Sequence, residues 1–258
     1  MNKLVAPSRR RFLTRLVVGA GTLVLSGCER LSESDWFPKV LSAGERVSAA
    51  VQTLVAGRKA MAQEFSEADI SPSFRSNGTA MPDSEAYEAL AAKGFADYRL
   101  EVGGLVGAPR SFSLAELRAL DSRMQITRHD CVEGWSAIGK WKGAKLSAVL
   151  DAVKAKPEAR FVVFHCADPM SDDGKDPYYE SIDMDDAWHP QTILAYELNG
   201  EALPIKNGAP IRLRVERQLG YKHAKYVMRI ELVESFAAIA GGNGGYWEDQ
   251  GYQWYAGI

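Results

Sequence analysis

Cysteine is scarce in this chain, with three in 258 residues. Three cysteines cannot supply the four ligands of an iron–sulfur cluster, and none of them lies in the Cys-x-x-Cys-His pattern that attaches a c-type haem. The G-x-G-x-x-G pattern of flavin and dinucleotide sites is also missing. A redox role would therefore need another kind of cofactor, and electrons would have to be exchanged with an external carrier.

Long hydrophobic runs are missing as well. The apolar run Leu16 to Leu25 has ten residues, too few to span a bilayer, and it follows five basic residues with no acidic residue before Glu29. Ser8 to Leu13, which reads Ser-Arg-Arg-Arg-Phe-Leu, fits the twin-arginine export pattern. A buried N-terminal helix of a cytosolic protein would not explain this charge asymmetry. The sequence predicts a twin-arginine signal peptide over residues 1–27, recognised by the twin-arginine export machinery.

The apolar run closes on Leu25-Ser26-Gly27-Cys28, which resembles the bacterial lipobox. In that motif the signal peptide is removed before a cysteine, and the new N-terminus is acylated. Cys28 is therefore predicted to be a lipid anchor to the membrane and not a metal ligand, with the mature protein at the periplasmic face of the cell envelope. Export in the folded state also hints at a prosthetic group inserted in the cytoplasm.

The mature chain is acidic. Removal of residues 1–27 leaves 231 residues with 26 basic and 33 acidic side chains, a net charge of −7. This balance argues against a nucleic-acid partner and leaves any anion binding to local basic clusters. Because the envelope is oxidising, Cys131 and Cys166 could form a disulfide, and this alternative stays open at the level of sequence.

The predicted elements indicate a mixed, β-rich α+β domain over residues 71–258, because strands and helices do not alternate as regular βαβ units. Residues 28–70 are predicted to be a polar tether and an amphipathic helix from Ala43 to Glu64, followed by a loop from Ser71 to Asp83 that is suited to lining a site. The predicted strands are Tyr98–Val106, Gln125–Val132, a run from Phe161 to a turn at Asp168-Pro169, Thr192–Leu198, Ile211–Val215 and Tyr226–Val233. The predicted helices are one opened by the capping box Ser113 to Glu116 and one over Leu146–Val153, and a turn is expected at Asn199-Gly200.

Cys131 is the most informative single residue. It ends a predicted strand and precedes Gly134, so the backbone can turn away while the thiolate points into a cavity. A soft thiolate suits a thiophilic metal, and His129, on the same face of the strand, keeps a copper site open. A buried core cysteine with no metal is the simpler interpretation of the local pattern.

Two basic turns stand out in the acidic chain. The first is Asn207-Gly208-Ala209-Pro210-Ile211-Arg212, and the second is Gly220-Tyr221-Lys222-His223-Ala224-Lys225. Together they favour an anion cradle suited to a phosphate, whereas each turn alone is also consistent with a solvated hairpin.

Taken together, Cys-Val-Glu-Gly-Trp-Ser at 131–136 and the two turns resemble the molybdenum-cofactor domain of the sulfite oxidase family, over roughly residues 70 to 235. The resemblance is greatest to the exported bacterial branch that includes periplasmic methionine-sulfoxide reductases. It implies that Cys131 binds molybdenum beside the dithiolene sulfurs of a molybdopterin. It also implies cofactor contacts from Asn77, Cys166, Asn207, Arg212, Lys222, His223, Ala224 and Lys225.

The resemblance has limits that bear on the substrate. Sulfite oxidases usually place an arginine directly before the asparagine of their first cofactor loop. This chain has Ser76 before the matching Asn77. Arg75 or Arg128 could substitute for that arginine. About 25 residues follow the last cofactor strand, too few for the family's dimerisation domain, so a monomer is expected. Tyr178, Tyr179 and Trp135 are weak candidates for pocket walls. The glycine- and aromatic-rich tail from Gly241 to Tyr255 either roofs the pocket or packs on the surface.

The expected function is a lipid-anchored molybdenum oxidoreductase that transfers an oxygen atom to or from a small sulfur or nitrogen oxide. Its expected electron carrier is a cytochrome or a membrane haem subunit. One alternative is a protein methionine-sulfoxide reductase. The non-enzymatic alternative is an envelope binding module that has lost the metal and joined Cys131 to Cys166.

Overall fold

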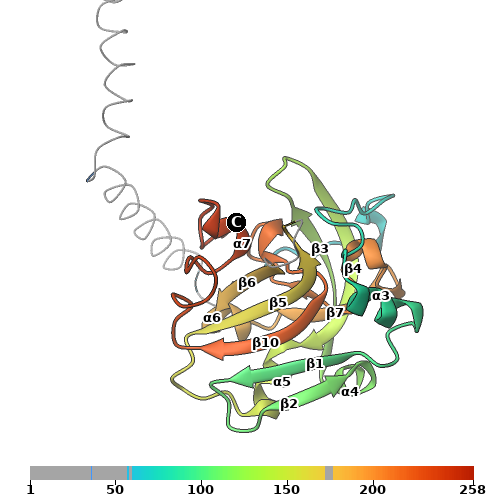
Figure 1. Cartoon of the computed structure of the whole chain (residues 1–258). Helices are drawn as coiled ribbons and strands as arrows, with labels where there is room; N and C mark the ends of the chain where they lie inside the picture. The colour runs from blue at the N-terminus through green and yellow to red at the C-terminus, as the bar shows by residue number, and fades with distance from the viewer. Residues whose placement is uncertain (1–35, 37–56, 58–59, 172–176) are drawn as a thin grey trace, which may run out of the picture. The chain divides into compact units, whose positions relative to one another are not determined.

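The structure is a computed structural model that describes Trp36, Gly57 and residues 60–171 and 177–258. The predicted signal peptide, Cys28 and most of the predicted helix from Ala43 lie outside these residues. Residues Arg58–Ile258 form one compact unit (Figure 1). Its helices are α3 (Glu85–Ala92), α4 (Leu114–Ala119), α5 (Leu146–Val153), α6 (Met184–Ala187) and α7 (Tyr246–Asp249), with short 3-10 turns η1 (Glu67–Asp69), η2 (Ile205–Asn207) and η3 (Gly220–Lys222).

The strands of the described residues form two five-stranded sheets. Sheet A has the order β3-β4-β7-β8, with β9 also paired to β7, and all its pairs are antiparallel. Its strands are β3 (Ser122–Asp130), β4 (Ser136–Lys145), β7 (Ile193–Leu198), β8 (Glu201–Ala202) and β9 (Arg212–Arg214). This sheet matters for function because β3 ends one residue before Cys131 and β9 carries two arginines.

Sheet B has the order β2-β1-β10-β5-β6. Its strands are β1 (Arg99–Gly104), β2 (Arg110–Ser113), β5 (Phe161–Pro169), β6 (Pro177–Asp183) and β10 (Val227–Val233). The pair β1–β10 is parallel and the other pairs are antiparallel, so sheet B is a mixed sheet. Because the helices and strands do not alternate as regular βαβ units, the domain is mixed α+β, as the sequence predicts. Figure 1 shows these strands side by side, with α7 beside the upper part of β6.

The main core lies where sheet B meets β7, β9 and α5. Leu100, Phe164 and Ile230 of sheet B and Leu194 and Leu213 of sheet A are fully buried in one cluster. The amphipathic pattern of Leu146 to Val153 places four apolar side chains of α5 in this core. Burying such side chains contributes about 1.5–3 kcal/mol each, so this core sets the position of the strand ends that carry the site.

Several local predictions are confirmed. Ser113 caps α4 and exchanges hydrogen bonds with Glu116, as the capping box requires. Asn199 and Gly200 both have positive φ, which matches a two-residue turn between β7 and β8.

Two local predictions are wrong. The predicted helix ending at Glu64 does not extend over residues 60–64, because Glu64 instead forms a bridge with Thr127 of β3. The predicted turn at Asp168-Pro169 is placed too early, because β5 continues through Pro169, which pairs with Pro177 of β6. β5 does end at this proline, so the predicted end of the strand is correct.

Residues 241–258, called here the C-terminal strap, fold back over the domain. Gly245 forms a bridge with Glu180 of β6, and Gly257 forms one with Gln218.

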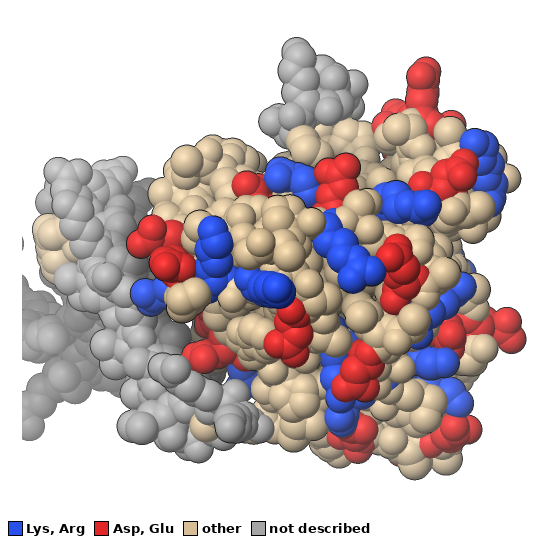
Figure 2. Space-filling view, turned by 90° about the horizontal axis from the view of Figure 1, so that it is seen from below, with Lys and Arg blue, Asp and Glu red and all other residues tan. Residues whose placement is uncertain are grey.

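On the face seen in Figure 2, basic and acidic side chains are interspersed. Within residues 60–171 and 177–258, no helix is long and apolar enough to cross a membrane.

Candidate functional site

A cleft lies between the loop after β3, the loop of residues 71–83 (called here the first loop), η3 and the C-terminal strap. Its lining includes Cys131, and the other lining residues are Asn77, Gly78, Thr79, Val132, Glu133, Asp168, Met170, Tyr178, Gly220, Tyr221, His223, Lys225, Trp247 and Tyr252. Four of the residues that the sequence predicts for the cofactor therefore meet at one cleft: Asn77, Cys131, His223 and Lys225.

Cys131 lies in a tight turn that follows β3. Its N–H donates to the carbonyl oxygen of Trp135 at 2.9 Å, and Gly134, with φ +85°, donates its N–H to the carbonyl oxygen of Cys131 at 3.0 Å. A residue with a side chain would be strained at that φ, so Gly134 makes the turn possible. Burial raises the pKa of the Cys131 thiol; a hydrogen bond from the backbone of Glu133 opposes this rise, the Glu133 carboxylate adds to it, and Arg75 and Arg212 oppose it.

Lys225 joins the first loop to the Asn207 turn. Its ammonium donates to the carbonyl oxygens of Asn77 at 2.6 Å, of Lys206 at 3.3 Å and of Thr79. Three carbonyl oxygens can use all three N–H donors of an ammonium. Burial lowers the pKa of Lys225 to about 7, with Arg212 adding to the effect.

Arg212 lies on β9 and is fully buried. Its guanidinium donates to the carbonyl oxygen of Asn207 at 3.2 Å and to Oδ1 of Asn77 at 3.3 Å, so three predicted cofactor residues are in direct contact. Burial, and then the charge of Arg214, lower the pKa of Arg212 to about 9. Arg214 already pairs with Glu216, so Arg212 is the buried guanidinium that favours an anion beside it.

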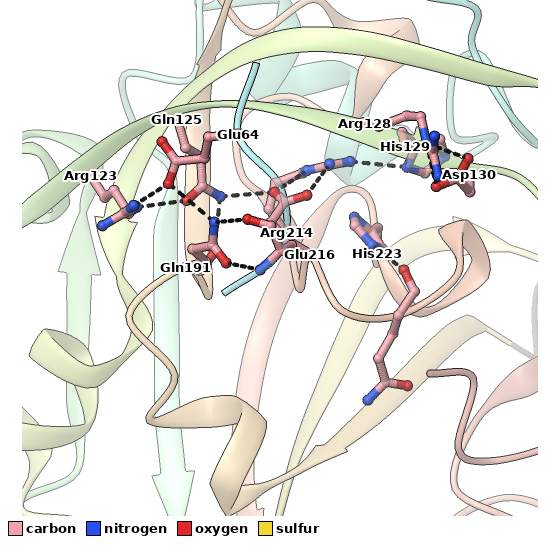
Figure 3. A network of polar contacts seen from close by, with 12 residues as sticks. Glu64, Arg123, Gln125, Arg128, His129, Asp130, Gln191, Arg214, Glu216 and His223 are labelled. Atoms are coloured by element: carbon pink, nitrogen blue, oxygen red, sulfur yellow. Dashed lines mark hydrogen bonds and ion pairs between the residues drawn. The ribbon is translucent and has the colours of Figure 1, made fainter. Parts of the chain in front are cut away.

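His129 is held by a buried network (Figure 3). Glu216 accepts two hydrogen bonds from Arg214, at 2.9 and 2.5 Å, and Arg214 donates to Nδ1 of His129 at 3.0 Å. Because a guanidinium can only donate, Nδ1 accepts and the proton of the neutral ring lies on Nε2. A Cβ added at Gly220 would lie 2.6 Å from that Nε2, so the ring requires a glycine there.

His223 has the opposite tautomer. Its Nε2 lies 3.0 Å from the carbonyl oxygen of Gln218 and must donate to it, which leaves Nδ1 as an acceptor. Burial lowers the pKa of both histidines well below the usual range, and the neighbouring arginines add to the effect, so both rings are neutral. The two rings meet edge to face at 5.0 Å, which places a donor and an acceptor side by side.

Several buried polar atoms in this region lack a hydrogen-bond partner among the described residues. They are His129 Nε2, Trp141 Nε1, Asp168 Oδ1, Asn207 Nδ2, Arg212 Nε and His223 Nδ1. A buried polar atom without a partner is costly, so a cluster of them indicates a polar ligand. Donors, acceptors and the Arg212 guanidinium together fit a molybdopterin, whose phosphate is anionic and whose pterin ring both donates and accepts. The residues present therefore fit the cofactor that the resemblance implies.

Lys222 lies elsewhere. It is fully buried and its Nζ contacts Oε1 of Glu180 at 2.5 Å and Oε1 of Glu248 at 2.6 Å. Its charge is thus compensated by two carboxylates, one on β6 and one in the C-terminal strap, and it does not line the cleft. The structure gives Lys222 a contact to the strap instead of an open position for a phosphate.

Cys166, Ala224 and Asn207 are buried and do not line the cleft. Cys166 lies on β5, where burial raises the pKa of its thiol well above the usual range. Both Cys131 and Cys166 are free thiols, so the disulfide of the non-enzymatic alternative is not formed.

The sequence did not point to Glu133, Asp168, Met170 or Trp247 as specific lining residues. Tyr178 does line the cleft, whereas Tyr179 and Trp135 do not. Tyr179 donates to Asp249 at 2.5 Å, and Trp135 donates to Glu133 at 3.0 Å. For Trp247 the available signal was the aromatic content of the tail, and no local signal marked the other three. Within the described residues, no cluster of three or more His, Cys, Asp and Glu side chains could hold a metal ion, so Cys131 would need other ligands beside it.

The family profile described as "Oxidoreductase molybdopterin binding domain" matches residues 88–238, more than half of the chain. The chain therefore belongs to this family of molybdopterin-binding oxidoreductases, and the resemblance to the sulfite oxidase family is confirmed.

The relatives narrow this further. The chain is 39% identical over 251 residues, 97% of its length and 88% of the relative's, to the "Putative protein-methionine-sulfoxide reductase subunit YedZ1" of Azospira oryzae. It is 38% identical over 151 residues to the "Protein-methionine-sulfoxide reductase catalytic subunit MsrP" of Xanthomonas axonopodis pv. citri, a match that spans 55% of this chain and 47% of that protein. Among solved structures, the sulfane dehydrogenase SoxCD of Paracoccus pantotrophus matches with a TM-score of 0.49 and 25% identity, covering 54% of this chain and 39% of that one.

Proposed function

We propose that this protein is a molybdenum-dependent reductase of methionine sulfoxide in exported proteins. The reaction takes a sulfoxide, two electrons and two protons to a thioether and water. When bound, the molybdenum cofactor supplies the oxygen-atom chemistry. The chain contributes the Cys131 thiolate to the metal, and Asn77, Arg212 and the two histidines to the pterin and its phosphate.

The observation that carries the choice of substrate is the charge of the cleft. Among the described residues that line it, Lys225 is the only cation, and its N–H donors are directed to backbone carbonyls. Glu133 and Asp168 add carboxylates, while Met170, Tyr178 and Trp247 make an apolar wall. An anion such as sulfite would meet two carboxylates and an apolar wall in this cleft. A neutral sulfoxide with an apolar side chain fits it better.

Neither arginine that could replace the sulfite oxidase clamp lines the cleft. Arg75 lies 5.5 Å from the ring of Trp135, and Arg128 pairs with Asp130 at 2.9 Å. Ser76 donates its hydroxyl to the carbonyl oxygen of Lys206 at 2.5 Å. The expectation of a small sulfur or nitrogen oxide is therefore less well supported than the methionine-sulfoxide alternative, which the names of the relatives also favour.

The cellular setting belongs to the same proposal. A twin-arginine signal over residues 1–27 and acylation at Cys28 would hold the protein at the periplasmic face, where oxidised proteins are its substrates. Electrons would come from an external cytochrome or membrane haem subunit. Incorporation of a radiolabelled fatty acid into the parent and a Cys28→Ala variant tests the anchor. We expect a labelled parent and an unlabelled variant, and a parent that takes up no label would contradict the proposal.

The decisive experiment is to produce the full chain in a molybdenum-replete host, beside a Cys131→Ala variant and a known molybdoenzyme as loading control. We expect near-stoichiometric molybdenum in the parent, loss of the metal in the variant, and reduction of a methionine-sulfoxide peptide with a reduced viologen dye as electron donor. Circular dichroism of the variant checks that it remains folded.

Two outcomes would overturn the proposal. Metal-free parent protein from a host that loads the control enzyme would rule out a molybdenum-dependent oxidoreductase function. Oxidation of sulfite without any reduction of sulfoxides would restore the small sulfur oxide as substrate.

A further inference from the structure

The C-terminal strap lies outside residues 88–238, the region that matches the family profile, and yet it forms part of the cleft. Trp247 and Tyr252 are its contributions to the lining. The N–H of Tyr252 donates to the carbonyl oxygen of Trp247 at 2.9 Å, and the two rings lie 5.3 Å apart. The ring of Tyr252 also meets Tyr221 edge to face at 5.4 Å. The strap thus adds a continuous aromatic surface to one side of the cleft.

This surface is held in place by buried polar contacts. Lys222 pairs with Glu248 at 2.6 Å, and the hydroxyl of Tyr221 donates to the carbonyl oxygen of Gln253 at 2.6 Å. Further along, Trp254 donates to the hydroxyl of Ser181 at 2.9 Å. Contacts on both sides of Tyr252 fix the backbone that carries it, so the strap is a wall with a defined position.

The mouth of the cleft carries apolar side chains that the fold leaves in water. Val132 is 49% exposed and Tyr252 is 40% exposed, and both line the cleft. Val132 follows Cys131 directly, whereas Tyr252 belongs to the strap, so they come from different parts of the chain. Exposed apolar side chains at the edge of a binding cleft offer a bound ligand apolar surface to cover.

A free methionine sulfoxide bound in the interior of the cleft is too small to contact the apolar side chains at its mouth as well. A methionine sulfoxide within a polypeptide reaches the interior with its side chain and leaves its neighbours at the mouth. An apolar neighbour would bury the exposed surfaces of Val132 and Tyr252, which is favourable in proportion to the apolar area removed from water.

We propose that Tyr252, supported by the strap and with Val132 beside Cys131, is a specificity-determining residue that binds an apolar residue next to the methionine sulfoxide of a polypeptide substrate. This inference rests on the proposed function and adds the class of polypeptide segment that the site selects. Lys222 is a positioning residue in this scheme, because it acts through Glu248 of the strap.

The test compares three substrates on the molybdenum-loaded full chain: a phenylalanine-flanked sulfoxide peptide, the same peptide with glycine flanks, and free methionine sulfoxide. Tyr252→Ser removes the ring, and Tyr252→Phe keeps it. Trp188→Ala is the matched control, because Trp188 is an aromatic residue with a similar exposure of 41% that does not line the cleft. The measured quantities are molybdenum content, kcat/KM for each substrate, and peptide binding by fluorescence anisotropy.

We expect the parent to prefer the phenylalanine-flanked peptide, and Tyr252→Ser to lose at least about tenfold of that preference, as is typical when an apolar contact is removed from a substrate pocket. The same variant should bind the labelled peptide correspondingly more weakly at unchanged molybdenum content. Tyr252→Phe and Trp188→Ala should keep the preference.

A parent that turns over sulfoxides without any flank preference, or a Tyr252→Ser variant that keeps the preference, would overturn this inference and leave the proposed function standing. A loaded parent that reduces none of the three substrates would overturn the proposed function, and this inference with it.

Discussion

Replacement of Lys222 by methionine separates two roles for this residue. The basic motif predicts a phosphate ligand, whereas the structure pairs Lys222 with Glu180 and Glu248, all three side chains being at most 1% exposed. Lys222→Met would leave two carboxylates buried without their cation, and breaking a buried ion pair in this way typically costs about 3–5 kcal/mol. For a domain of this size, that corresponds to a fall of roughly 10 °C in the unfolding midpoint.

The pH dependence provides an internal check. Burial raises the pKa of Glu180 well above its usual range, and loss of the Lys222 charge would raise it further. A carboxyl group with a raised pKa in the folded state contributes stability that is fully present below its unfolded pKa and is lost as the pH rises through its folded pKa. The deficit of Lys222→Met should therefore be smallest near pH 5 and largest near pH 8.

The assay is thermal unfolding followed by tryptophan fluorescence, on protein produced with and without molybdenum. A triple variant with Lys222→Met, Glu180→Gln and Glu248→Gln, which has no leftover charge, should recover most of the lost stability. If Lys222→Met instead melts like the parent and loses molybdenum, the lysine binds the cofactor and the strap contact is unimportant.

Three further predictions concern the walls of the site. Gly220→Ala places a Cβ 2.6 Å from Nε2 of His129 and should cost about 1–3 kcal/mol of stability together with part of the molybdenum content, so an unchanged midpoint and full loading would contradict the packing. Asp168 has its pKa raised to about 6 by burial, so ionisation of this group should make the parent less stable at pH 8 than at pH 5 by about 1–2 kcal/mol. Urea titrations of Asp168→Asn should show a flatter pH profile, and an identical profile would exclude the assignment. Glu216→Gln leaves Arg214 charged in the core without a carboxylate and should destabilise the protein by about 3–5 kcal/mol, whereas a midpoint within about 2 °C of the parent would show that the network of Figure 3 is not structural.

Local signals were enough for the elements whose cause is local. The capping box at Ser113, the apolar period of Leu146 to Val153 and the Asn199-Gly200 turn each contain the reason for their own conformation. The sequence does not predict β4, because two of its alternate buried positions, Gly139 and Gly143, are glycines that give no apolar signal. Position 143 on β4 requires glycine, because a Cβ there would lie 2.2 Å from the carbonyl oxygen of Leu194 on β7. Only the paired strands of the sheet reveal this constraint.

The site residues also divide into those that a local motif reveals and those that only the folded structure reveals. Cys131, Asn77 and Lys225 could be found from motifs, since each occupies a fixed place in a short sequence pattern. The partners that decide the charge of the site are distant in sequence: Glu180 and Glu248 lie 42 and 26 residues from Lys222. No local pattern reports such pairs, because β6, η3 and the strap meet only in the folded domain.

The position of β10 in sheet B has a consequence for how the protein is made. This strand, formed by Val227–Val233, lies between β1 and β5, so the β1–β2 hairpin and the β5–β6 pair remain separate until it inserts. Its partner Glu101 precedes Arg229 by more than 120 residues, and pairings of this range are slow to form. The edges of β1 and β5 stay open to wrong pairing throughout that interval. The turn from Gly220 to Lys225 directly precedes β10, so we expect closure of the sheet and completion of the cofactor cradle to be one late folding event.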